Sequence, residues 1–206
     1  MHNHVAEGES LRFEKEREMK SRINQRDILK LRFLILPMSI LILFACVTVP
    51  SKTYEETILQ WKSYDDVAKW MKENFSYDIN RAKEAVRTRS IIVRTPKETF
   101  ELKSGVCFDA ARFAKEMLDC IDPSYEAQIV YIENRPYEID HYVCSFKKDN
   151  RLYILDYGTF YRNMVGTHGP FNSLEEYKKF YERNHPKVKK VQSISYGWPS
   201  RVRLAE

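Results

Sequence analysis

A glycine turn that leads directly into an amphipathic helix is the part of this sequence that most restricts its possible folds. Residues 103–121 read KSGVCFDAARFAKEMLDCI, and apolar side chains recur through them at helical spacing. The apolar positions are Phe108, Ala111, Ala114, Leu118 and Ile121. We therefore expect a helix that begins at or next to Cys107 and packs one face against a core.

The predicted start of this helix gives Cys107 a distinctive chemical environment. Unpaired backbone N–H groups and the positive end of the helix dipole both favour a thiolate in the first helical turn. Gly105, just upstream, lets the backbone approach its neighbours closely. A cysteine in this position is chemically primed if a base lies nearby.

The chain before this stretch has helical patterns. Residues 54–61 and 64–75 are expected to form two helices, with Ser63 and Asp66 as a capping pair for the second. Their apolar face, which we assign to the core, consists of Ile58, Trp61, Val67, Trp70, Met71 and Phe75. The mixed, basic segment 77–94 is expected to hold a loop and one helix.

A short helix is predicted directly before the glycine turn. Thr95-Pro-Lys-Glu98 combines a capping threonine, proline at the first helical position and glutamate at the third. This helix would lead the chain into the turn at Gly105.

After the cysteine-bearing helix the apolar pattern changes from helical to alternating. Residues 127–132 resemble a strand, and residues 141–146 and 152–156 are expected to form a hairpin across Lys148-Asp-Asn150. Segments rich in strands after segments rich in helices indicate an α+β fold with an antiparallel sheet.

The last part of the chain is expected to add one helix and one strand. Ser173-Leu-Glu-Glu176 is a capping box that opens a helix to about Asn184, which Pro186 stops. Residues 188–196 are interpreted as a final strand.

Three residues in this order suggest nucleophilic catalysis. Cys107 begins a helix, His141 opens one hairpin strand, and Asp156 ends the other. A thiol that is mostly protonated at neutral pH needs an imidazole to take its proton, and the imidazole needs an acceptor that fixes its orientation. If the two strands pair as the hairpin predicts, His141 and Asp156 lie on the same face of the sheet and within reach of each other across the two strands.

The other cysteines and histidines have simpler interpretations. Cys120 and Cys144 are interpreted as small buried apolar side chains. We expect His168 to lie in a loop and His185 to end a helix. A zinc site made of the three proposed catalytic residues is disfavoured, because no paired-ligand spacing supports it. No metal and no cofactor are expected.

The ordered blocks around these residues resemble the transglutaminase-like superfamily of cysteine enzymes. The blocks are Thr95-Pro-x-Glu-Thr99, Lys103-Ser-Gly-Val-Cys-Phe-Asp-Ala-Ala111, Asp140-His-Tyr-Val143 and Leu152-Tyr-Ile-Leu-Asp-Tyr157. The resemblance covers roughly residues 54–184. It implies a papain-like core with the cysteine-bearing helix packed on an antiparallel sheet. It also implies Cys107 as nucleophile, His141 as general base and acid, and Asp156 as the orienting acid.

The resemblance implies a cysteine hydrolase that cleaves peptide or amide bonds through a thioester. Two alternatives stay open: a non-catalytic envelope-binding module on the same fold, and a protein cross-linking transglutaminase. The oxyanion would be held by the Cys107 backbone N–H and by a second donor, for which a Trp, Tyr or Gln upstream is expected, such as Gln60 or Trp61.

An uncharged apolar run, residues 33–45, follows a polar N-terminal segment and ends at Cys46. A basic flank and an apolar stretch of this length are typical of an export signal, whose start is either Met1 or Met19. Leu43-Phe-Ala-Cys46 resembles the lipobox of bacterial lipoproteins, in which the cysteine is lipidated. The alternatives are an uncleaved membrane anchor and a buried core helix.

These features divide the chain into residues 1–46, an n-region with a signal or anchor, and residues 47–206, a single transglutaminase-like domain. The length and the 43% hydrophobic content suit one domain with a core. A net charge of +5 without an aromatic-interleaved basic stripe argues against nucleic acid as a partner. The expected partners are a peptide or protein substrate and the membrane, and the expected location is the bacterial cell envelope.

Overall fold

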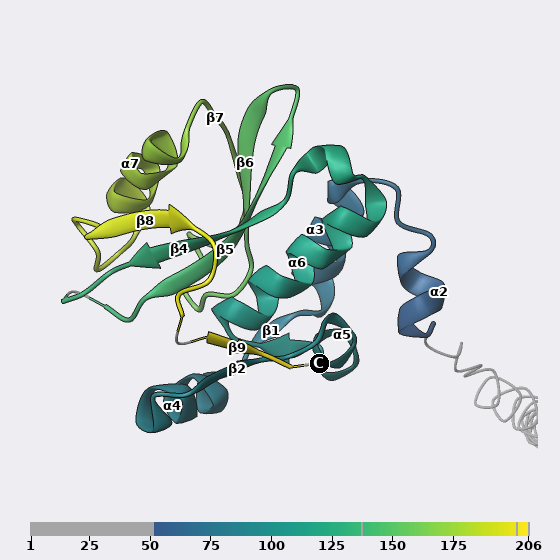
Figure 1. The fold of residues 1–206 in the computed structure, drawn as a ribbon, viewed down its shortest axis with the longest axis horizontal. Coiled ribbons are helices and arrows are strands. Elements are labelled where there is room, and N and C mark those ends of the chain that lie inside the picture. Colours follow the sequence, from purple (N-terminus) through teal and green to yellow (C-terminus); the bar gives the residue numbers. More distant parts are fainter. Residues whose placement is uncertain (1–51, 137, 201, 206) are drawn as a thin grey trace, which may run out of the picture. The chain divides into compact units, whose positions relative to one another are not determined.

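The helices of the structure begin at the capping residues that the sequence supplies. This computed structural model describes residues 52–136, 138–200 and 202–205, which belong to one compact unit, residues 52–206 (Figure 1). Its helices are α2 (Tyr54–Ile58), α3 (Tyr64–Asn74), α4 (Ile79–Thr88), α5 (Pro96–Leu102), α6 (Cys107–Ile121) and α7 (Leu174–Asn184), with a 3-10 turn at Pro123–Tyr125. Capping boxes open α3 at Ser63 and α5 at Thr95, and the Ser173 side chain caps α7, as predicted.

Five antiparallel strands form the main sheet, in the order β7-β6-β5-β4-β8. The strands are β4 (Gln128–Glu133), β5 (His141–Lys148), β6 (Arg151–Asp156), β7 (Gly166–Phe171) and β8 (Ser193–Tyr196). The predicted hairpin joins β5 and β6, with Lys148 paired to Arg151. Asp149 and Asn150 make its two-residue turn, and both have positive φ, as a type I′ turn requires.

Helices cover both faces of this sheet, which makes the fold α+β as predicted (Figure 1). Successive strand residues point to opposite faces. Cys144 and Leu155 accordingly pack with α3 and α6 in one apolar cluster, whereas Val143 and Ile154 pack with α7 in another. Strand β5 is therefore buried on both sides along most of its length.

Two small parallel pairings surround the start of α6. Strand β1 (Ser76–Tyr77) pairs with β3 (Ser104–Gly105), and β2 (Ile91–Val93) pairs with β9 (Val202–Leu204). Both lie beside the start of α6 in Figure 1. The segment before α4 is therefore tied to the turn that precedes Cys107, and the segment after α4 is tied to the C-terminal strand β9.

Several expectations were wrong in detail. The segment 77–94 contributes two short strands besides its helix. The strand expected over residues 188–196 is limited to Ser193–Tyr196, and it is not the final one, because β9 follows it. His168 lies in β7 and not in a loop. This strand contains Gly169 and Pro170, which suppress strand propensity, but it lies at the edge of the sheet, where proline is tolerated.

The two remaining cysteines of the described region behave differently from each other. Cys144 is fully buried, as predicted, and burial raises the pKa of its thiol. Cys120 is exposed, so its assignment to the core was wrong. It lies near the end of α6, on the side of the helix away from the buried face that includes Leu118.

The predictions on the N-terminal segment, including Cys46 and the apolar run, lie outside the described residues. Within residues 52–136, 138–200 and 202–205, no helix has the length and apolarity needed to cross a bilayer.

Candidate active site

Cys107 is the first residue of α6, directly after the N-cap residue Val106. Its side chain is mostly buried, at 7% exposed. The end of strand β6 leaves room for it, because a Cβ on Gly158 would lie 2.4 Å from the Cys107 Cα. The missing side chain at Gly158 thus lets the N-terminus of α6 approach the sheet, where the two other proposed residues lie.

His141 and Asp156 form a hydrogen-bonded pair within the sheet. The His141 Nε2 lies 2.9 Å from the Asp156 Oδ2, and both residues are buried. Their strands are in register through Cys144 and Leu155, which makes the two residues diagonal neighbours on one face. A proton on Nε2 donates to the carboxylate and leaves Nδ1 as the ring nitrogen that can accept one.

The Cys107 thiol and His141 line the same narrow pocket, and the thiol lies close enough to act on the pKa of the imidazole. Burial lowers the pKa of His141, but the charge and hydrogen bond of Asp156 and the contact with Cys107 outweigh it. Together they raise this pKa to about 10. The imidazole of His141 is therefore protonated at neutral pH.

Helix α7 packs against the His141 imidazole. The Tyr181 ring stacks on His141 with a centroid distance of 6.2 Å, and the Tyr181 hydroxyl accepts a hydrogen bond from Asn134. His185 ends α7, as predicted, and its Nδ1 accepts from the Val188 backbone N–H. Burial and the neighbouring His141 lower the pKa of His185 to about 4, so this second histidine stays neutral.

Cys107 opens onto two cavities. A cleft of about 890 Å³ runs from Cys107 along α4, and its lining includes Tyr77, Ala85, Val86 and Tyr142. A narrow pocket of about 20 Å³ is lined by both Cys107 and His141 and has room for one water molecule. The cleft is large enough for several residues of an extended chain.

Tyr77 lines both of these cavities and was not identified from the sequence. Its backbone is paired with Gly105, two residues before Cys107, and the Gly105 carbonyl accepts from the Asp78 N–H. Burial and the nearby Cys107 raise the pKa of the Tyr77 hydroxyl, which therefore remains a proton donor at neutral pH. Two-residue strands have no sequence pattern, which explains why this pairing was missed.

The two residues suggested as oxyanion donors lie elsewhere. Trp61 packs against Trp70 and Phe113 in the core on the α3 side, and the Gln60 side chain accepts a hydrogen bond from Lys52. Neither contributes to the lining of the two Cys107 cavities as the described residues form them.

No group of three or more His, Cys, Asp or Glu side chains in the described part of the chain is arranged to hold a metal ion. The chemistry that this arrangement can perform on its own is proton transfer and nucleophilic attack by the thiol.

Comparison with known proteins identifies the family. Residues 49–168 match the family described as "Transglutaminase-like domain". Among solved structures, one titled "Legionella pneumophila LapG (EGTA-treated)" is 20% identical with a TM-score of 0.35, over 50% of this chain and 54% of that chain. One titled "Crystal structure of a TGase" is 15% identical with a TM-score of 0.39, over 63% of this chain and 39% of that chain.

The chain therefore spans about half of the first neighbour's length and less of the second's. No curated protein matches the chain. The family match covers more than half of the sequence, including the cysteine-bearing helix and the hairpin with His141 and Asp156. The chain belongs to the transglutaminase-like family.

Proposed function

We propose that this protein is a cysteine hydrolase that cleaves peptide or amide bonds through a thioester intermediate. Cys107 is the nucleophile, His141 the general base and acid, and Asp156 the residue that orients the imidazole. The observation that carries the proposal is the buried, hydrogen-bonded pair of His141 and Asp156, whose imidazole shares a narrow pocket with Cys107. A binding module has no need of this arrangement.

The first half of the reaction forms the thioester. The Cys107 sulfur attacks the amide carbonyl carbon, while the thiol proton resides on His141. Collapse of the tetrahedral intermediate breaks the C–N bond, and the imidazolium gives its proton to the leaving amine. Asp156 keeps the ring oriented and stabilises its positive form.

The second half releases the acyl group. Neutral His141 takes a proton from water, the resulting hydroxide attacks the thioester carbonyl, and the Cys107 thiolate leaves as the carboxylic acid forms. A lysine amine in place of water would instead form an isopeptide bond, so the choice of acceptor separates a hydrolase from a cross-linking enzyme.

The oxyanion of each tetrahedral intermediate needs two donors. The first is the Cys107 backbone N–H, which has no partner within the helix because Cys107 is the first residue of α6. For the second we propose the Tyr77 hydroxyl, because Tyr77 shares both cavities with Cys107 and keeps its proton at neutral pH.

Export and membrane attachment belong to the same proposal and rest on the sequence alone. The apolar run 33–45 and the lipobox-like Cys46 favour a lipoprotein whose substrate lies in the cell envelope. A diacylglycerol mass on Cys46 would support this assignment, and an intact N-terminus would exclude it.

The thiolate–imidazolium pair is tested by the pH dependence of alkylation. We expect iodoacetamide to modify Cys107 fastest among the cysteines near pH 6, as measured by peptide mapping of the full chain. His141→Ala should slow Cys107 without changing exposed Cys120, which serves as the internal reference. If Cys107 reacts no faster than Cys120, the catalytic proposal fails and a binding role takes its place.

The role of Tyr77 is tested by comparing two reactions of the same thiol. Acylation by p-nitrophenyl acetate passes through an oxyanion, whereas alkylation by iodoacetamide does not. Tyr77→Phe should slow acylation by about 10²–10³-fold, the usual cost of losing one oxyanion donor, and leave alkylation unchanged. Equal effects on both reactions would show that Tyr77 acts on the position or ionisation of the thiol instead.

A further inference from the structure

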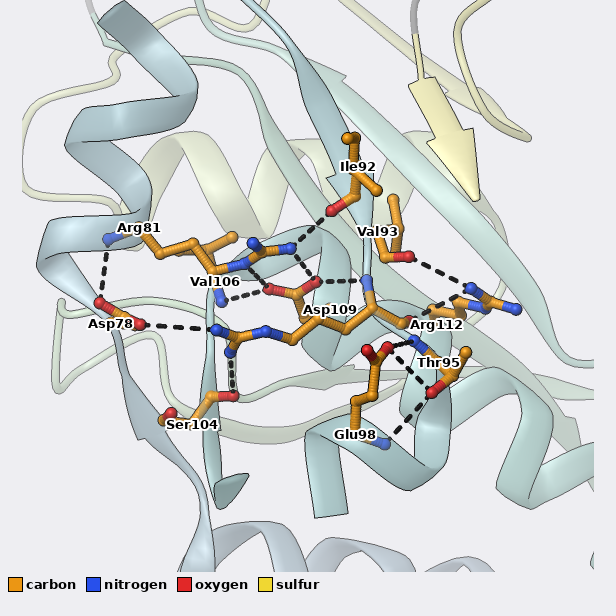
Figure 2. Close-up of polar contacts among 11 residues, drawn as sticks. Asp78, Arg81, Ile92, Val93, Thr95, Glu98, Ser104, Val106, Asp109 and Arg112 are labelled. Atoms are coloured by element: carbon orange, nitrogen blue, oxygen red, sulfur yellow. Dashed lines mark hydrogen bonds and ion pairs between the residues drawn. The ribbon is translucent and has the colours of Figure 1, made fainter. Parts of the chain in front are cut away.

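Asp109, two residues after Cys107, is a fully buried carboxylate that the proposed mechanism does not use. Its Oδ2 accepts from the Val106 N–H at 3.1 Å, and its Oδ1 accepts from the Arg94 N–H at 2.9 Å. The guanidinium of Arg81 completes the set with Nε at 2.6 Å from Oδ2 and Nη2 at 2.9 Å from Oδ1. Each carboxylate oxygen therefore accepts two hydrogen bonds, as Figure 2 shows.

Arg81 comes from α4, the helix that lines the cleft. Its Nη2 also donates to the Ile92 carbonyl in β2, and its guanidinium lies over the Phe108 ring at 5.4 Å. The arginine thus contacts both residues that follow Cys107. The helix end is fixed as well, because Asp78 caps α4 by accepting from the Arg81 backbone N–H.

A second arginine connects the same parts. Arg94 donates its backbone N–H to Asp109 and its Nη1 to the Ser104 carbonyl in β3, and its Nη2 lies 3.9 Å from the Asp78 carboxylate. Two arginines from outside α6 therefore hold the Ser104 carbonyl before the nucleophile and the Asp109 side chain after it.

The contact with Val106 bears directly on the nucleophile. Val106 is the N-cap of α6, and the Asp109 carboxylate at the third helical position accepts from the N-cap N–H, which is one of the two hydrogen bonds of a capping box. This contact sets the angle at which α6 begins, and so the direction of the Cys107 N–H and thiol. The negative charge of Asp109 would also oppose a thiolate two residues away if nothing neutralised it.

We propose that Arg81 is a positioning residue for the nucleophile. Its two hydrogen bonds to the Asp109 carboxylate hold the start of α6, and with it Cys107, against helix α4. Its positive charge also neutralises the carboxylate near the thiol. A bidentate guanidinium does both, whereas a lysine would supply the charge without the paired geometry. The inference rests on the proposed function, because it assigns a role in preparing the Cys107 thiolate.

The test measures Cys107 alkylation against pH in the full chain, with thermal unfolding alongside. Arg81→Met leaves the Asp109 charge unmatched and should move the midpoint of the pH profile upward by about 1 unit. Asp109→Asn leaves the Arg81 charge unmatched and should move the midpoint downward. The other titratable groups around the thiol are unchanged in both variants; they are Tyr77, Glu138, Asp140, His141, Asp156, Tyr161, Tyr181 and His185.

Two further variants keep the test decisive. Arg81→Lys retains the charge, so its midpoint should match the wild type while its plateau rate falls several-fold. It also carries the test if Arg81→Met does not fold. Arg87→Met removes an exposed arginine of α4 that pairs with Glu84, and it should change neither the midpoint nor the plateau rate.

The outcomes separate this inference from the function on which it rests. Opposite midpoint shifts in Arg81→Met and Asp109→Asn support the positioning role. The positioning role would be overturned if Arg81→Met and Asp109→Asn lowered the unfolding temperature without moving the midpoint, and if Arg81→Lys kept the wild-type plateau rate. Arg81 and Asp109 would then have a structural role alone. If wild-type Cys107 reacts no faster than Cys120, the proposed function itself has failed.

Discussion

Two buried aspartates belong to the surroundings of Cys107, and their carboxylates differ in how many hydrogen bonds they accept. Asp109 accepts four hydrogen bonds, two of them from an arginine that is always charged. Asp156 binds one nitrogen of His141, and its Oδ1 has no hydrogen-bond partner in the described part of the protein. The pair of Asp109 and Arg81 is suited to fix the geometry of the backbone around it. The pair of Asp156 and His141 is suited to change its protonation during a reaction.

The contrast predicts a large difference in stability. Asp109→Ala leaves Arg81 and two backbone N–H groups without their acceptor, so we expect a loss of about 3–5 kcal/mol in the free energy of unfolding. Asp156→Ala should cost about 1–3 kcal/mol, because His141 can release its proton and become neutral. Urea unfolding of both variants measures the difference. A larger loss for Asp156→Ala would contradict this division of roles.

The contrast also predicts a difference in pH dependence. Asp156 keeps His141 protonated up to a pKa of about 10 against the opposing effect of burial. In Asp156→Asn the raising charge is lost, the imidazolium deprotonates at lower pH, and the basic limb of thioester formation should move down by about 1–3 units. The profile of acylation by p-nitrophenyl acetate measures this shift.

A surface carboxylate on the same helix as the nucleophile provides the control. Asp119 pairs with Lys115 one turn away and is partly exposed, so Asp119→Asn should leave the basic limb in place. A basic limb that stays at its wild-type position in Asp156→Asn would mean that another group sets the charge on His141.

The parts of the fold that were predicted from the sequence depend on contacts within a few residues. A capping box needs only Thr95 and Glu98, and the hairpin needs only Asp149 and Asn150 between two alternating segments. The helix that starts at Cys107 was predictable for the same reason, since its apolar face repeats over several turns.

The parts that escaped prediction depend on residues far apart in the chain. Arg81 and Asp109 are 28 positions apart, and nothing local to either residue identifies its partner. An acidic residue three positions after Val106 was a usable sign of a capping contact, but it did not reveal the arginine. The edge strand β7 was hidden by Gly169 and Pro170, whose local preferences the neighbouring strand overrides.

The pairing of β2 with β9 has a consequence for the time at which this site forms during synthesis. Arg112 in the nucleophile helix donates to the Val93 and Ala205 carbonyls, which lie on the two paired segments. Residues 202–205 leave the ribosome almost a hundred residues after Cys107 does. Until they have been made, β2 lacks its partner strand, and the carbonyls that hold Arg81 and Arg112 are not fixed. The thiol should therefore acquire its full reactivity only after residues 202–205 have been made and have paired with β2.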